Sequence, residues 1–110
     1  MTVPRIEEDV VERGTRAALG AVEIERHRQT TKWGVQRHSF PVWTAVLMEE
    51  VGEVAQAVLK GREEALSLNT RIPRSWLLKQ RAEAVQVAAV AVAIVEHLDE
   101  LLAKGEAGNA

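Results

Sequence analysis

The chain has 110 residues, of which 27% are charged, with a formal net charge of −2 and no cysteine. This length fits a single domain, residues 1–110, small enough that oligomerisation would help to cover its apolar surface. The weak net charge argues against general attraction to nucleic acid or to an anionic membrane. The lack of cysteine excludes disulfides and cysteine-ligated zinc. The acidic N-terminus has no signal-peptide pattern, and the longest apolar run, residues 87–95, is too short for a membrane span. We therefore expect a cytoplasmic homodimer or tetramer without nucleic-acid or membrane partners.

The first predicted helix runs from about Arg5 to Thr31, and Gly14 could divide it into two helices. Its apolar side comprises Ile6, Val10, Ala17, Ala21 and Ile24. A linker over residues 32–41 follows, in which aromatic and basic groups are concentrated although the chain has only 4% aromatic residues. These groups are Lys32, Trp33, Arg37, His38 and Phe40. The linker is a candidate binding surface, since binding residues are often carried on loops.

The second predicted helix begins at Pro41 and runs to about Lys60, where Gly61 could end it in the left-handed conformation. A short helix over residues 63–69 and a connection over residues 70–74 follow. Ser75 is the predicted cap of the last helix, which extends from Trp76 to Leu102 without Gly or Pro. That length favours a helix over a buried strand. Residues 105–110 are predicted to be a frayed tail, and the chain as a whole is predicted to be an all-α antiparallel bundle of three to five helices.

The acidic segment of the second helix contains the most informative residues. A helical stripe of apolar side chains is formed by Trp43, Val46, Leu47, Val54, Ala57 and Val58. Glu50 falls in the middle of this stripe and Glu53 on its edge, whereas Glu49 points more outward. Carboxylates rarely face a core without a partner. A cation shared by Glu50 and Glu53 would offset their repulsion, and the alternative is a salt-bridge network with nearby Arg or Lys.

Glu83 and Gln86 repeat the same spacing on the last helix. If the two helices pack face to face, four oxygen-bearing side chains meet, a donor set that suits Mg²⁺, with Mn²⁺ as a substitute. The histidines lack the spacing of a zinc site. Alternatively, Glu83 and Gln86 are ordinary residues of a helix start, where a carboxylate interacts favourably with the dipole. The basic residues near this pair are either solvated charges or ligands of a polyphosphate: Arg62, Arg71, Arg74, Lys79 and Arg81.

At these residues the chain resembles the all-alpha nucleoside triphosphate pyrophosphohydrolase superfamily, which includes MazG-like proteins and the dimeric dUTPase and dCTPase relatives. The motif of that superfamily is EExxE followed by ExxD. The first half stands here as Glu49-Glu50-Val51-Gly52-Glu53, and the second as Glu83-Ala84-Val85-Gln86. The segment Lys32-Trp33-Gly34, with His38 after it, further resembles short phage-type and mobile-element members. The resemblance covers about residues 24–98.

The resemblance implies a MazG-like homo-oligomer that cleaves a nucleoside triphosphate, ribo or deoxy, between its alpha and beta phosphates. The products are a nucleoside monophosphate and pyrophosphate, and nucleotide-pool housecleaning is the implied role. Metal ligands would be Glu50, Glu53 and Glu83, with Gln86 as a fourth. Glu49 would bind a second ion or orient the attacking water.

The predicted substrate-binding residues come from the linker and from the last helix. They are Lys32, Trp33, His38, Lys79, Arg81 and Gln86. Gln86 stands where the superfamily has Asp, and it removes one negative charge from the expected metal site. Two alternatives therefore remain: a catalytically degenerate module that binds a nucleotide or a partner, and a purely structural oligomerisation protein.

Overall fold

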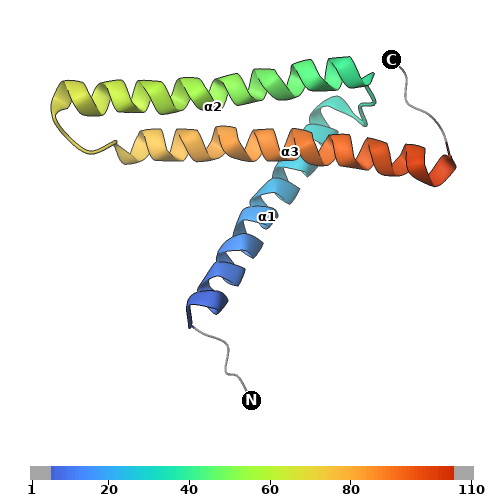
Figure 1. The fold of residues 1–110 in the computed structure, drawn as a ribbon, viewed down its shortest axis with the longest axis horizontal. Coiled ribbons are helices and arrows are strands. Elements are labelled where there is room, and N and C mark those ends of the chain that lie inside the picture. Colours follow the sequence, from blue (N-terminus) through green and yellow to red (C-terminus); the bar gives the residue numbers. More distant parts are fainter. Residues whose placement is uncertain (1–5, 106–110) are drawn as a thin grey trace.

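The computed structural model describes residues 6–105, which form three long helices and no strand. These are α1 (Ile6–Trp33), α2 (Phe40–Leu68) and α3 (Arg74–Lys104). Helices α2 and α3 lie side by side and antiparallel, whereas α1 crosses α3 and its N-terminal half extends away from the pair (Figure 1). The predicted all-α helical bundle is confirmed, with three helices.

Helix α1 is longer and more regular than predicted. It continues through Gly14 without a break and ends at Gly34, which has a left-handed φ of 73°. The Gly34 N–H donates a hydrogen bond of 2.8 Å to the Thr30 carbonyl. Lys32 and Trp33 therefore belong to the last turn of α1, and their placement in the linker was wrong. The predicted start at Arg5 lies outside the described residues.

Helix α2 does not end at Gly61, which corrects the predicted boundary. It continues through the segment predicted as a separate short helix, and Asn69, with φ of 52° and ψ of 48°, provides the left-handed cap. Gly61 is buried, and a Cβ atom there would lie 3.0 Å from Cβ of Trp76. The glycine allows α2 and α3 to approach closely and does not end the helix.

Helix α3 begins at Arg74, with Pro73 rather than Ser75 in the capping position and no side-chain cap. The Pro73 carbonyl accepts hydrogen bonds from the N–H groups of Trp76 and Leu77, at 3.0 and 3.2 Å. The prediction that Ser75 caps the helix was therefore wrong. At the other end Gly105, with φ of 67°, provides the C-cap. The rest of the predicted tail, residues 106–110, lies outside the described part of the chain.

The core lies between α2 and the second half of α3. Trp43, Val90 and Ala93 are buried in it, and several half-buried apolar side chains pack around them. Trp43 is 3% exposed, and its indole Nε1–H donates a hydrogen bond of 2.9 Å to Nδ1 of His97. This bond satisfies the polar atom of a buried aromatic ring and fixes the register of α2 against α3.

Helix α1 packs on α3 through a face that the hydrophobic pattern did not predict. Its buried residues are Val22 and Gln29, and Arg26 donates two hydrogen bonds to Glu96, at 3.2 and 2.8 Å. Ile24, on the predicted apolar side, is 71% exposed. Polar pairing, together with Val22, therefore determines which side of α1 faces α3.

The chain is less compact than most domains of this length. The radius of gyration of its Cα atoms is 18.0 Å, compared with about 13 Å for a compact domain of this size. Apolar side chains are uncovered on all three helices, among them Leu19, Val51, Val95 and Leu102. None of the described helices is long and apolar enough to cross a membrane.

Candidate metal centre

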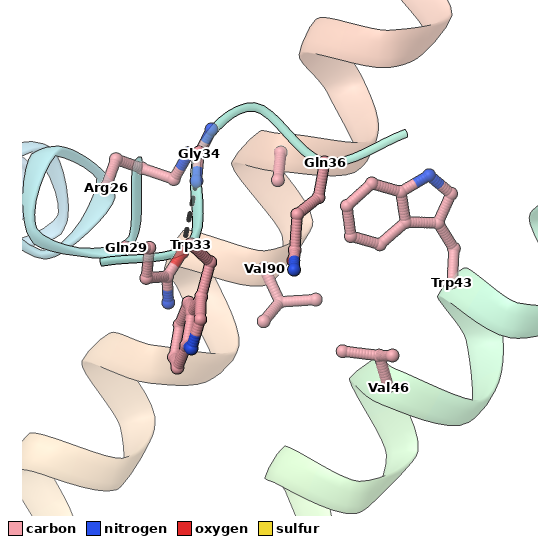
Figure 2. Close-up of a pocket in the computed structure, with 9 residues that line it drawn as sticks. Arg26, Gln29, Trp33, Gly34, Gln36, Trp43, Val46 and Val90 are labelled. Carbon is pink, nitrogen blue, oxygen red and sulfur yellow. Dashed lines mark hydrogen bonds between the residues drawn. The ribbon is translucent and has the colours of Figure 1, made fainter. Parts of the chain in front are cut away.

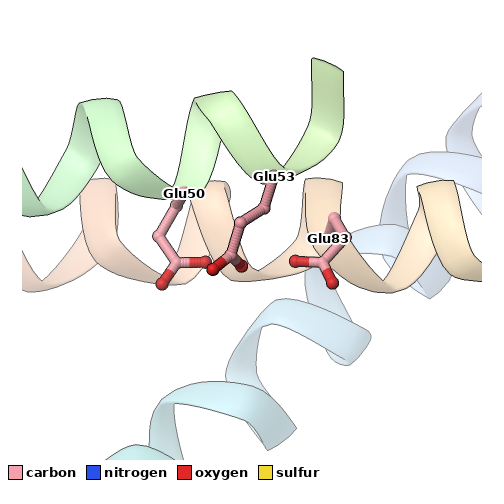
Figure 3. A group of neighbouring side chains, drawn as sticks. All are labelled: Glu50, Glu53 and Glu83. Carbon is pink, nitrogen blue, oxygen red and sulfur yellow. The ribbon is translucent and has the colours of Figure 1, made fainter. Parts of the chain in front are cut away.

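Three carboxylates converge at the seam between α2 and α3. Glu50 and Glu53 come from α2 and Glu83 from α3, and each offers an oxygen atom within 4.8 Å of the other two. Figure 3 shows them in a row, with Glu53 between Glu50 and Glu83. We call this group the acidic cluster. It forms because the apolar stripe of α2 packs on α3 and carries Glu50 to the contact line.

Two oxygens of the acidic cluster are buried without a partner. Glu83 is 7% exposed, and its Oε1 lies 2.8 Å from Nζ of Lys79. Its Oε2 has no hydrogen-bond donor, and neither does the buried Oε2 of the half-buried Glu50. Buried carboxylate oxygens without donors are costly and uncommon in folded proteins. A cation between the two helices would satisfy both.

The pKa values of the cluster reflect this crowding. Burial, followed by the charge of Glu53, raises the pKa of Glu50. The pKa of Glu53, an exposed residue, is raised because its protonated carboxyl can donate a hydrogen bond to Glu83, and partial desolvation adds to the effect. Hydrogen bonding from Lys79 lowers the pKa of Glu83 despite its burial. Among the described residues, neither Glu50 nor Glu53 has an ion-pair partner to offset this repulsion, since Lys79 is paired with Glu83.

The donor set fits Mg²⁺ or Mn²⁺. All three candidate ligands are carboxylates, which these ions prefer. With Mg–O distances of about 2.0–2.1 Å, two oxygens on one ion lie at most about 4.2 Å apart. The present spacing, within 4.8 Å, needs only small side-chain adjustments. Zinc fits poorly, since it favours histidine and cysteine ligands.

The other residues predicted at this site lie around the cluster. Glu49 is exposed, and its charge contributes to raising the pKa of both Glu50 and Glu53. Gln86 is half-buried, one turn beyond Glu83 on α3. Arg81 is exposed and two residues before Glu83, a spacing that puts it on a different side of the helix.

A cavity beside the cluster lies where α1 and the following loop meet α2 and α3 (Figure 2). Among the residues that line it are Arg26, Gln29, Trp33, Gln36, Trp43, Val46 and Val90. We call it the aromatic cavity. Its volume of about 60 Å³ is too small for a nucleobase. Trp33, which is 51% exposed, forms one wall, and its side chain would have to turn outward to admit a ring.

The predicted linker residues surround this cavity in different ways. The Lys32 ammonium lies 4.8 Å from the centre of the Trp33 ring, a cation–π contact. His38 packs edge-on against Trp43, with ring centres 4.7 Å apart. Gln29 and Gln36 were not singled out from the sequence, although Gln29 lies one turn before Trp33 on the same helix face. Ending the predicted helix at Thr31 hid that relation.

Comparison with known proteins gives no match: no family model, no curated protein and no solved structure is significantly similar to this chain. The case for a function therefore depends on the residues and their geometry.

Proposed function

We propose that this protein is a Mg²⁺-dependent nucleoside triphosphate pyrophosphohydrolase, which releases a nucleoside monophosphate and pyrophosphate. The observation that carries the proposal is the acidic cluster, in which carboxylates from two helices converge and two buried oxygens lack partners. The resemblance of its two half-motifs to EExxE and ExxD supports the same function. A nucleotide-pool housecleaning role follows from that reaction.

In this proposal the chain contributes negative charge at fixed positions. Glu50, Glu53 and Glu83 hold the metal, and Gln86 adds a neutral oxygen one turn further along α3. When bound there, Mg²⁺ would neutralise phosphate charge and help to activate water. Glu49, next to Glu50 in the sequence, would orient the attacking water or bind a second ion. The attack breaks the bond between the alpha phosphorus and its bridging oxygen, and pyrophosphate leaves.

The base would bind on the side of the aromatic cavity. Trp33 provides an exposed ring for stacking once it turns outward, and Gln29 and Gln36 provide hydrogen-bonding groups for base edges. Lys32 is held against Trp33 and would approach the sugar or the phosphates. His38 supports Trp43 and would contact the base only from behind that ring.

A second copy of the chain would cover the open protomer. The radius of gyration and the uncovered apolar residues of α1 and α3 support a homodimer or a tetramer. In that assembly further substrate contacts come from the partner subunit. Sedimentation velocity would contradict this part of the proposal if the protein remained monomeric at micromolar concentrations.

A second candidate function is a degenerate module that binds a nucleotide or a partner without turnover. Gln86 favours it, because a neutral ligand in place of Asp weakens the attraction to Mg²⁺. This candidate predicts nucleotide binding without pyrophosphate release.

The test is pyrophosphate release from a panel of canonical and modified nucleoside triphosphates with Mg²⁺ or Mn²⁺. Wild type is compared with Glu53→Gln and with Glu63→Gln, an exposed acid of the same helix. Turnover in wild type and in Glu63→Gln, lost in Glu53→Gln, is the expected result. Silence across the panel in pure wild-type protein would refute the hydrolase and favour the degenerate module.

A further inference from the structure

A second cavity lies on the other side of the acidic cluster, between the later part of α2 and the first part of α3. Its volume is about 370 Å³. The residues that line it are Glu53, Gln56, Ala57, Lys60, Trp76, Lys79 and Glu83. We call it the basic cavity, after its two lysines, and it shares Glu53 and Glu83 with the cluster.

The antiparallel packing sets the order of the three sites along the bundle. Residues that follow Glu53 on α2 face residues that precede Glu83 on α3, and these line the basic cavity. The aromatic cavity instead involves Val46, before Glu50, and Val90, after Glu83. The acidic cluster therefore lies between a small cavity walled by tryptophans and a larger cavity with two ammonium groups.

Lys79 links the basic cavity to the cluster. Its Nζ lies 2.8 Å from Oε1 of Glu83, while its side chain remains 59% exposed. The hydrogen bond with Glu83 raises the pKa of Lys79, so the amine is charged at neutral pH. It serves only one oxygen, because Oε2 of Glu83 stays buried without a donor. The ion pair with Lys79 therefore offsets only part of the cost of burying the Glu83 carboxylate, which is 7% exposed.

We propose that the basic cavity binds the polyphosphate end of the substrate, with Lys60 and Lys79 as its ammonium ligands, and that metal binding releases Lys79 from Glu83 for this purpose. The inference rests on the proposed function, since it takes the acidic cluster to be the metal site. A divalent ion at Glu83 competes with Lys79 for the same carboxylate and repels its charge. The flexible four-carbon stem of lysine lets the ammonium turn into the cavity, where phosphate oxygens replace the lost partner.

This arrangement couples two binding events through one side chain. In the absence of phosphate, Lys79 opposes the metal, because it must leave Glu83 first. Once phosphate is present, the displaced ammonium gains a new anionic partner. Metal and polyphosphate therefore favour each other's binding, and the coupling is reciprocal. Lys60 takes part only in the phosphate step.

The test measures metal and phosphate binding separately on the full chain, without using turnover. Binding of Mn²⁺ alone is followed by electron paramagnetic resonance, and inorganic pyrophosphate is titrated by calorimetry at constant excess Mg²⁺. The variants are Lys79→Met and Lys60→Met. Lys104→Met, in the last turn of α3, is the matched control.

Lys79→Met is expected to bind Mn²⁺ about threefold to fivefold more tightly, the effect of losing a competing ion pair whose lysine is largely exposed. The same variant should bind pyrophosphate at least about tenfold more weakly, as for loss of a charge-assisted hydrogen bond. Lys60→Met should weaken only pyrophosphate binding, and Lys104→Met neither.

Unchanged pyrophosphate affinity in Lys79→Met, or unchanged Mn²⁺ affinity in the same variant, would overturn the inference. So would wild-type protein that binds no Mn²⁺. If wild type turns over nucleotide but the lysine variants keep wild-type affinity for Mn²⁺ and pyrophosphate, the inference is refuted and the hydrolase proposal stands. The expected lysine effects in a protein without turnover would refute the hydrolase and leave the phosphate site.

Discussion

Glu50→Gln should have opposite effects on stability with and without metal. Burial and the neighbouring carboxylates raise the pKa of Glu50 above its ordinary value of 4.5. Folding therefore disfavours the ionised form of Glu50. The contribution of protonated Glu50 to the stability of the folded state is fully present below pH 4.5, and it is lost as the pH rises through the folded-state pKa. At pH 7 glutamine, which has nearly the same shape and no charge, should raise the melting temperature of the metal-free protein.

Metal binding reverses the comparison. With 10 mM Mg²⁺ and a dissociation constant on the order of 1 mM, ligand linkage stabilises the wild type by about 1.4 kcal/mol. Unfolding entropy of about 2.1 cal/mol/K per residue turns this, for a chain of 110 residues, into a rise of about 6 °C. Loss of one of three carboxylates that weakens binding about tenfold would leave a rise of under about 2 °C.

The assay is thermal melting followed by circular dichroism at one protein concentration, since association makes the melting temperature depend on concentration. Samples contain 10 mM MgCl₂, or EDTA with NaCl at matched ionic strength. Glu63→Gln carries the same charge change at an exposed position of α2. It should keep the full Mg²⁺ response and shift the metal-free melting temperature by no more than about 2 °C.

Two results would contradict this reasoning. Equal Mg²⁺ responses in wild type and Glu50→Gln would show that Glu50 is not a ligand. A lower melting temperature of the metal-free variant at pH 7 would show that the charge of Glu50 is compensated in the fold. The metal-free difference should also shrink as the pH falls through the raised pKa of Glu50 and should vanish below 4.5, where wild-type Glu50 is neutral in both the folded and the unfolded state.

Three further predictions address packing, catalysis and pH. Gly61→Ala should lower the melting temperature, because overpacking against Trp76 at 3.0 Å costs about 1–3 kcal/mol and the gain in helix propensity is at most about 1 kcal/mol. Gly52→Ala, with no atom within 4 Å, should instead add about 0.5–1 kcal/mol. Gln86→Asp should tighten Mg²⁺ binding about tenfold and raise the rate of pyrophosphate release. An unchanged Mg²⁺ affinity together with an unchanged rate would exclude residue 86 as a metal ligand. The Arg26 guanidinium lowers the pKa of Glu96, so their pair stabilises α1 on α3 above pH 4.5 and is lost as the pH falls through the lowered pKa. Amide protection factors in α1, which correct for the slower intrinsic exchange in acid, should accordingly fall as the pH is lowered.

The acidic cluster could be found from the sequence because two simple regularities determine it. A helical period puts Glu50 on the packed side of α2 and Glu53 at its exposed edge, and antiparallel packing of two long helices brings Glu83 opposite them. Neither step depends on exact helix ends. The sequence pattern did not reveal the ion pair between Lys79 and Glu83. A lysine one turn before a glutamate gives the same pattern whether it is solvated or paired with that glutamate.

The errors fall where one local signal fits two structures. Gly61 could equally end a helix or allow a close contact, and only the position of Trp76 decides between them. The interface of α1 also depends on tertiary structure, since Arg26 donates hydrogen bonds both to Glu96 on α3 and to the buried Gln29. A hydrophobic pattern cannot report such a polar pairing.

The arrangement of charge separates a metal site from a structural ion-pair network. A structural network should provide a cation for each acid at the contact, as Arg26 does for Glu96 and Arg37 for Glu100. Among the described residues, the acidic cluster has one ion pair, between Lys79 and Glu83.

Replacing a half-buried, unpaired acid such as Glu50 with a neutral residue is expected to stabilise a fold, so stability does not account for its presence. The proposed divalent ion would account for it, since it would supply two charges at the place where the oxygens lack donors. The higher metal-free stability expected of Glu50→Gln and its expected loss of the Mg²⁺ response are therefore two independent tests of the same idea, that Glu50 is kept unpaired to bind a metal.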